Sequence, residues 1–66
     1  MTNNDVLRRL RYTFGYTDSK MISFFKLANE EVTRAEVSNW LKSDEDDDFK
    51  ELEDHKLAAF LNGLIV

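Results

Sequence analysis

The side chains that can carry out acid-base chemistry in this sequence are one histidine, His55, and a run of carboxylates before it. Nucleophilic catalysis requires a serine, cysteine or threonine beside a base, and His55 is the single candidate base. His55 follows Asp54 at the expected beginning of a helix, where the helix dipole disfavours a protonated imidazole. Metalloprotease, P-loop, dinucleotide-binding and Ser/His/Asp motifs do not occur. We therefore predict a surface histidine, no enzyme activity and no cofactor.

The acidic run at positions 44–48 invites comparison with a calcium-binding loop, because aspartates alternate in it. An EF-hand loop requires glycine at its sixth position and glutamate at its twelfth. Counted from Asp44, those positions hold Phe49 and His55. We therefore predict a solvated loop over residues 43–48 and no metal site. Loose binding of divalent cations and contact with a basic partner stay open as alternatives.

Charge is divided unevenly along the chain, whose net charge is −4. Residues 1–42 hold seven basic and five acidic side chains, which gives +2, whereas residues 43–66 hold two basic and eight acidic ones, which gives −6. An acidic protein is poorly attracted to phosphate, although a basic face on the first part of the chain can still bind it locally.

A helix expected at residues 33–42 is the candidate nucleic-acid face. A helix, a turn and a second, well-capped helix resemble the general plan of a helix-turn-helix module. The connection from Ala28 to Thr33 is longer than the usual turn of three or four residues, and the acidic loop follows immediately. Nucleic acid is therefore the alternative partner, through Arg34, Ser38, Asn39 and Lys42, with Arg8 and Arg11 as further contacts.

Length and composition predict one all-α domain covering residues 1–66. Proline is absent and glycine occurs twice, so the chain lacks most of the residues that form turns in β-rich proteins. Cysteine is also absent, which leaves helix packing to stabilise a chain that buries only about 60% of its unfolded surface. The chain shows neither a signal peptide nor an apolar run long enough to span a membrane, so we expect a cytoplasmic protein.

Local signals place the helix ends. Asn4 or Asp5 can cap the first helix, and Gly15 can end it in the left-handed conformation. The same reasoning gives caps at Thr17-Asp18 and Asp54 for the second and last helices. We predict a compact four-helix orthogonal bundle with a helix-turn-helix-like corner, and its helices lie near residues 4–14, 18–28, 33–42 and 54–65.

The start of the third helix is specified twice. Thr33 and Glu36 have the spacing of a capping box, and Val32 and Val37 occupy the two positions of a hydrophobic staple. The helix then directs Val37 and Trp40 inward. Apolar residues at helical spacings predict a core of Val6, Leu7, Leu10, Phe14, Met21, Phe25, Val37, Trp40, Leu41, Leu57, Phe60, Leu61 and Leu64.

The second helix and the C-terminal run hold more apolar residues than one small core requires. We interpret the surplus as an association surface for another protein or a second copy of the chain. The apolar run 64–66 also leads us to expect that further chain normally follows. The candidate interface residues are Phe24, Leu27, Ile65 and Val66.

Three blocks of sequence resemble one family: residues 3–12 (NNDVLRRLRY), residues 31–42 with EVTRAEV and Trp40-Leu41-Lys42, and residues 57–65 (LAAFLNGLI). They are similar to the YehS-like bacterial cytoplasmic proteins of unknown function. The resemblance implies a unit that usually occurs as two tandem copies, of which this chain has one. It implies no activity, ligand or catalytic residue.

Overall fold

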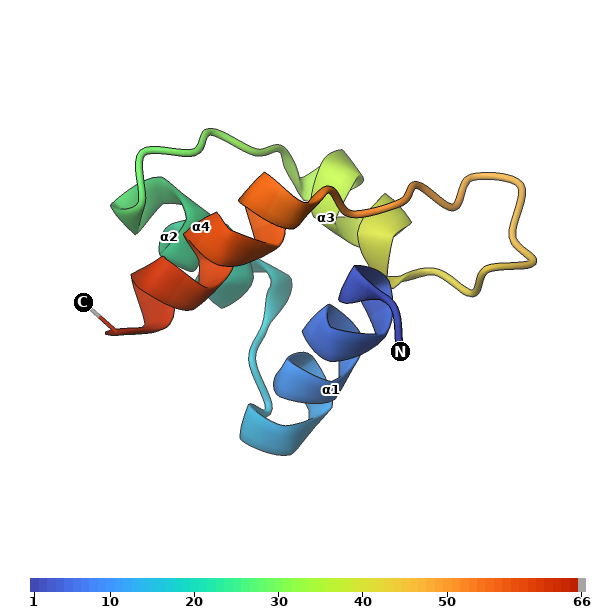
Figure 1. The fold of residues 1–66 in the computed structure, drawn as a ribbon, viewed down its shortest axis with the longest axis horizontal. Helices are drawn as coiled ribbons and strands as arrows, with labels where there is room; N and C mark the ends of the chain where they lie inside the picture. Colours follow the sequence, from blue (N-terminus) through green and yellow to red (C-terminus); the bar gives the residue numbers. More distant parts are fainter. Residues whose placement is uncertain (66) are drawn as a thin grey trace.

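The computed structural model describes residues 1–65, which form four helices and, in that range, no strand: α1 (Asn3–Phe14), α2 (Asp18–Leu27), α3 (Arg34–Leu41) and α4 (Asp54–Ile65). The predicted all-α bundle is confirmed, with each helix end within one residue of its predicted position. Helices α2 and α4 lie side by side, and the acidic loop projects from the end of the bundle opposite the C-terminus (Figure 1). No helix among these residues is long and apolar enough to cross a membrane.

Helix α1 begins with a capping box that the sequence reading missed. The Thr2 hydroxyl accepts a hydrogen bond from the Asp5 backbone N–H, and the Asp5 carboxylate accepts one from the Thr2 backbone N–H. The prediction of Asn4 or Asp5 as the cap is therefore wrong, because Thr2 and Asp5 already satisfy the free N–H groups. At the other end, Gly15 ends α1 in the left-handed conformation, as predicted (φ 65°).

The remaining helix starts follow the sequence more closely. Thr17 caps α2, and Thr33 forms the predicted capping box with Glu36 at the start of α3. Asp54 is not the cap of α4 but its first helical residue, since the first backbone hydrogen bonds of this helix run to the carbonyl of Glu53. Its carboxylate is used instead in a contact with α1.

The core gathers around the aromatic rings of Phe25, Phe60 and Trp40. The Phe25 ring lies 5.2 Å from the Phe60 ring and 5.4 Å from the Trp40 ring, measured between centroids. These spacings are typical of favourable aromatic pairs. The buried apolar residues are Leu7, Met21, Phe25, Val37, Trp40, Leu52, Ala59 and Phe60, with Leu10, Leu41, Leu57 and Leu64 partly buried against them.

Two residues predicted in the core are exposed. Phe14 is 60% exposed because it ends α1, where its ring stacks on Tyr16 rather than entering the core. Leu61 is 38% exposed because α4 turns Ala59, Phe60 and Gly63 toward the bundle. Val6, also predicted in the core, is only half-buried.

Asn4 is the one fully buried polar residue among residues 1–65. Its side-chain amide donates to the backbone carbonyls of Trp40 (2.9 Å) and Lys50 (2.8 Å), and its oxygen accepts from the backbone N–H of Leu52 (2.9 Å). Next to it, the Asn3 amide donates to the carbonyl of Leu52 (3.0 Å). Two consecutive asparagines therefore fasten the segment before α4 to the start of α1.

Replacing Asn4 by alanine should destabilise the domain by about 2–4 kcal/mol, because a buried N–H and two carbonyls lose their partner. Urea unfolding followed by circular dichroism measures the change. The control is Asn3→Ala, which removes hydrogen bonds at a more exposed position and should cost about 1 kcal/mol. Equal unfolding midpoints for the two variants would contradict this role of Asn4.

The backbones of α2 and α4 approach each other closely at Gly63. A Cβ atom placed on Gly63 would lie 1.9 Å from the backbone carbonyl oxygen of Phe24 and 2.7 Å from its carbonyl carbon. Real Cβ atoms do not approach backbone so closely, and neither helix can yield without separating the pair. The glycine thus sets the distance at which α4 packs on α2.

Gly63→Ala should destabilise the domain by about 1–3 kcal/mol, because the clash outweighs the better helix propensity of alanine. Thermal unfolding measures it. The neighbouring Asn62→Ala, at an exposed position of the same helix, should leave the melting temperature unchanged or raise it. A melting temperature for Gly63→Ala at or above that of the parent would show that the helices do not touch there.

Candidate interaction surface

Large exposed apolar side chains lie on α2 and α4, the two helices that touch at Gly63, and others, Met1, Tyr12 and Phe14, lie at α1. Leu27 of α2 is 55% exposed, and Ile65 of α4 is 83% exposed. Both were predicted interface residues, and the structure leaves both uncovered. Val66, another predicted interface residue, lies outside the described residues. The exposed Leu61 joins the set, because it lies one helical turn before Ile65 on the same face of α4.

Phe24, the remaining predicted interface residue, is partly buried. Its ring makes edge contacts with Tyr16 (4.9 Å between centroids) and Phe60 (5.6 Å). The ammonium group of Lys20 lies 5.7 Å from the centre of the same ring, within the range of a cation-π contact. Part of the Phe24 ring therefore packs inside the domain and is not available to a partner.

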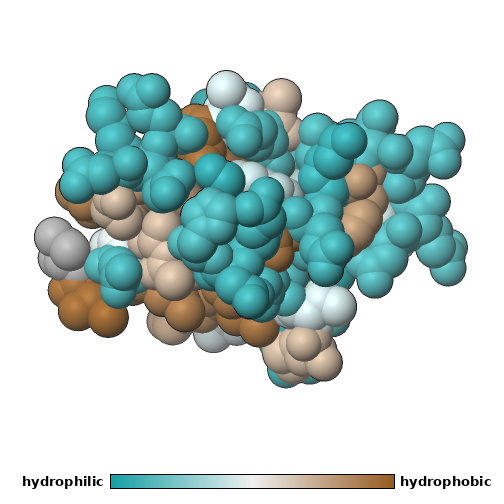
Figure 2. Space-filling model, turned by 45° about the horizontal axis from the view of Figure 1, so that its top comes forward, coloured by the Kyte–Doolittle hydropathy of each residue, from teal (hydrophilic) through white to brown (hydrophobic). Residues whose placement is uncertain are grey.

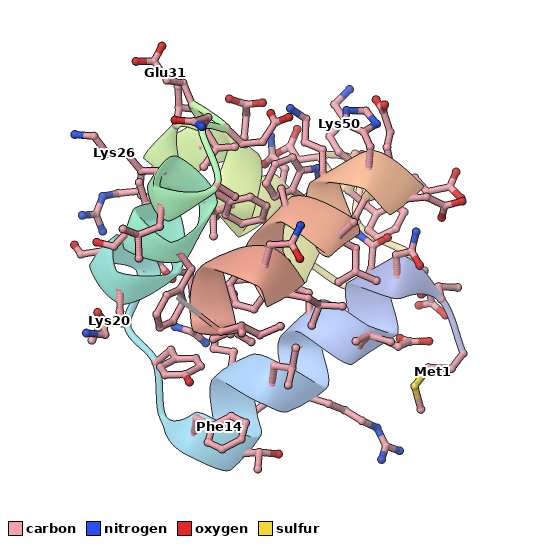
Figure 3. All side chains as sticks on the ribbon, turned by 60° about the vertical axis from the view of Figure 1, so that its left-hand side comes forward. Met1, Phe14, Lys20, Lys26, Glu31 and Lys50 are labelled. Atoms are coloured by element: carbon pink, nitrogen blue, oxygen red, sulfur yellow. The ribbon has the colours of Figure 1, made fainter. Side chains whose placement is uncertain are left out.

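A continuous series of aromatic contacts links this surface to the core. It runs from the exposed Phe14 through Tyr16, Phe24 and Phe60 to Phe25, with each pair of rings 4.9–5.6 Å apart between centroids. Close-packed rings in the core restrict movement of those at the surface. The end of α1, shown by the labelled Phe14 in Figure 3, is thereby fixed relative to α2 and α4.

The opposite end of the molecule is polar. In Figure 2 the right-hand end, formed by the acidic loop, is mostly hydrophilic, whereas hydrophobic atoms collect toward the lower left. The longest dimension of the domain, 33 Å, runs between these two ends. The acidic loop thus lies at the end of the domain away from the C-terminal end of α4.

Arg8 ties the acidic loop to α1. Its guanidinium donates to the Asp5 carboxylate and to the backbone carbonyl of Lys42, and it lies 3.4 Å from the Asp44 carboxylate. The hydrogen bond from the Thr2 backbone, followed by that from Arg8, lowers the pKa of Asp5 from 3.8 to about 2. The same carboxylates raise the pKa of Arg8. The positive charge of Arg8 is thus paired with carboxylates of the same domain.

The predicted nucleic-acid residues do not form one free cationic face. Lys42 pairs with Asp48 of the acidic loop (3.4 Å), and Arg34 donates to the Ser19 hydroxyl (2.8 Å). Ser38 and Asn39 are half-buried between them along α3. Of the two further contacts that were predicted, Arg8 is engaged as described and Arg11 lies 3.4 Å from the Asp18 carboxylate.

The surface of α2 carries a shallow depression of 340 Å³, lined by Ser23, Lys26 and Leu27. Its exposed wall is mainly apolar, and titratable groups do not converge on it. Within residues 1–65, three or more His, Cys, Asp or Glu side chains do not come together as metal ligands. The arrangement fits contact with a macromolecular surface better than enclosure of a small substrate.

Comparison with known proteins finds relatives of unknown function. A family model described as "Protein of unknown function (DUF1456)" matches residues 3–66. The chain belongs to this family. It is similar to the uncharacterized protein YehS of Escherichia coli (strain K12), with 34% identity over 65 residues, which cover 98% of this chain and 42% of YehS. The predicted family resemblance is therefore confirmed. No solved structure matches the chain.

The chain spans less than half of the length of YehS, so more than half of that relative lies outside the matched region. In YehS, the matched unit is therefore joined to a further stretch of chain. The size relation is compatible with the tandem arrangement that the resemblance implies. It assigns no activity to this domain.

Sequence reasoning missed the exposure of Leu61. Leu61 fits the apolar spacing of α4, so its exposure follows only from the packing of Ala59, Phe60 and Gly63 against the bundle.

Asp5→Asn should lower stability at neutral pH but not at low pH. A carboxyl group with a lowered pKa stabilises the fold above its unfolded value, and the gain is lost as pH falls from about 4 toward about 2. The difference in urea midpoint between parent and variant should therefore close over that interval. A difference that stays constant between pH 6 and pH 2 would contradict the ionised contact with Thr2 and Arg8.

Proposed function

We propose that this DUF1456 domain is a small helical interaction domain that binds another protein or a second copy of itself through α2 and α4. The observation that carries the proposal is the exposure of Leu27, Leu61 and Ile65 on two helices that pack directly together. Large apolar side chains scattered singly are ordinary, but several on adjoining helices are typical of an association surface.

The rigidity of the surface supports this function. The Phe24 ring is held by Tyr16 and Phe60, and the backbones of α2 and α4 touch at Gly63. A preformed surface loses little conformational entropy when a partner binds. The acidic loop lies at the other end of the molecule, where it does not oppose association of apolar groups (Figure 1).

The nucleic-acid alternative has less support. Lys42, the cation expected to reach phosphate, is paired with Asp48, and the acidic loop stands beside it. A domain with a net charge of −4 would bind phosphate only through a concentrated basic patch, and α3 does not present one. We therefore favour a protein partner.

A photo-activated crosslinking residue in place of Leu61 should form adducts in bacterial cells. The same residue in place of Glu45, in the acidic loop, is the matched control and should form few. Adding Ile65→Asp should reduce the Leu61 adducts about tenfold, because a carboxylate would be buried in an apolar contact. Since Ile65 is so exposed, circular dichroism should show an unchanged melting temperature. Equal labelling at both positions, or no labelling, would refute the proposal.

A further inference from the structure

The last turn of α4 contains the pair Asn62-Gly63, a sequence at which asparagine is chemically least stable. An asparagine deamidates when the backbone nitrogen of the next residue attacks its side-chain carbonyl carbon, and a side chain on that next residue hinders the attack. Glycine has no side chain, so it hinders the attack least. Asn62 is the one asparagine, of five in the chain, that a glycine follows.

The fold requires this glycine. A Cβ atom at position 63 would overlap the backbone carbonyl of Phe24, so α4 can pack beside α2 only with glycine there (Figure 1). Asn62 itself is exposed. The close packing of the two helices thus places an unhindered peptide nitrogen directly after an accessible asparagine.

The other asparagines are protected by their surroundings or by the residue that follows them. Asn3 and Asn4 use their side-chain amides in hydrogen bonds to the segment before α4. Asn39 is half-buried and precedes a tryptophan. Asn29 is exposed in a turn, but Glu30 follows it, and the side chain of Glu30 hinders the attack. Asn29 therefore shows what exposure does without a following glycine.

Helical structure slows the reaction at Asn62. In an α-helix each backbone N–H donates to the carbonyl four residues earlier, which for Gly63 is the carbonyl of Ala59. The helical backbone also holds the Gly63 nitrogen away from the Asn62 side chain. Attack therefore requires local opening of the last turn. Glycine weakens a helix, and helix ends open at lower cost than the core does.

We propose that Asn62 is a site of spontaneous deamidation, and that its modification weakens the contact between α4 and α2. The Gly63 nitrogen forms a bond to Cγ of Asn62, the bond between Cγ and Nδ2 breaks, and ammonia leaves with the proton of the Gly63 N–H. The product is a succinimide ring, which one water molecule opens at either carbonyl. Opening yields aspartate, or isoaspartate, in which the main chain runs through the former side chain.

Isoaspartate adds one carbon to the main chain between Cα of Asn62 and the nitrogen of Gly63. The contact with Phe24 leaves no room for this change, because even one added Cβ atom would overlap the backbone there. Aspartate leaves the main chain unchanged, and its side chain lies at an exposed position. The modification is a property of α4 itself, so it does not depend on what the domain binds.

Peptide mass spectrometry after incubation at physiological temperature and slightly alkaline pH tests the site. An isoaspartyl methyltransferase, used as a reagent, counts the isoaspartate. In unfolding urea, Asn62 should be converted well before the other asparagines, and isoaspartate should be the main product. In the folded domain, Asn62 should again be converted first, but about 10- to 1,000-fold more slowly, because opening of the last turn must precede the attack.

Leu64→Ala should accelerate conversion in the folded domain about tenfold, because it removes partly buried packing of the last turn, and it should leave the rate in urea unchanged. Ile65→Ala is the matched control, since Ile65 is 83% exposed, and it should change neither rate. Asn62→Gln should remain unmodified, because its longer side chain closes the corresponding ring far more slowly.

The isoaspartate form, separated chromatographically from aged protein, should melt about 5 °C or more below the parent. Asn62→Asp should melt close to the parent, because its main chain is unchanged. Absence of conversion at Asn62 in the folded domain, or earlier conversion at Asn29, would overturn the assignment of the site. Equal rates in urea and in buffer would overturn the required opening of α4. An isoaspartate form that melts with the parent would overturn the effect on the contact with α2.

Discussion

The fold depends on one buried amide. Asn4 lies in the first turn of α1, yet its side chain joins the end of α3 and the segment that leads into α4. All three of its hydrogen bonds are made to backbone groups that would otherwise be unpaired inside the protein. Because these bonds fix the path of residues 50–52, they also fix where α4 begins and which of its sides meets α2.

The position of α4 then determines the proposed interaction surface. Gly63 can lie against the backbone of Phe24 only if α4 starts in the right register, and the exposed face with Leu61 and Ile65 follows from that contact. Phe24 in turn holds Tyr16 and, through it, the end of α1. A polar interaction at one end of the bundle thus organises the apolar surface at the other.

The helices were predictable because their ends are specified by neighbouring residues. The spacing of Thr33 and Glu36 predicts a capping box at the start of α3. Gly15 predicts the end of α1, because glycine can adopt the left-handed conformation. The role of Asn4 was not predictable, because its partners are backbone groups more than 35 positions away that have no sequence signature. The neighbouring sequence predicted Asn4 as the N-cap of α1, but Thr2 is the N-cap.

The surface was predictable only in part. The surplus of apolar residues on α2 and at the C-terminal end correctly indicated that Leu27 and Ile65 are uncovered, although their binding role stays a prediction. Leu61 was predicted in the core because its spacing in α4 matches that of buried residues. Helical spacing alone does not show which apolar residues of a helix the fold buries.

Asn4 binds its partners only through their main-chain atoms, so the side chains of those partners can differ among related proteins. It recognises main-chain atoms at Lys50 and Leu52, so most side chains between α3 and α4 are irrelevant to that attachment. Insertions, deletions and charge reversals in the preceding loop can therefore accumulate while the helical scaffold stays the same. Related proteins can vary this exposed loop independently of the apolar face that lies at the far end of the molecule.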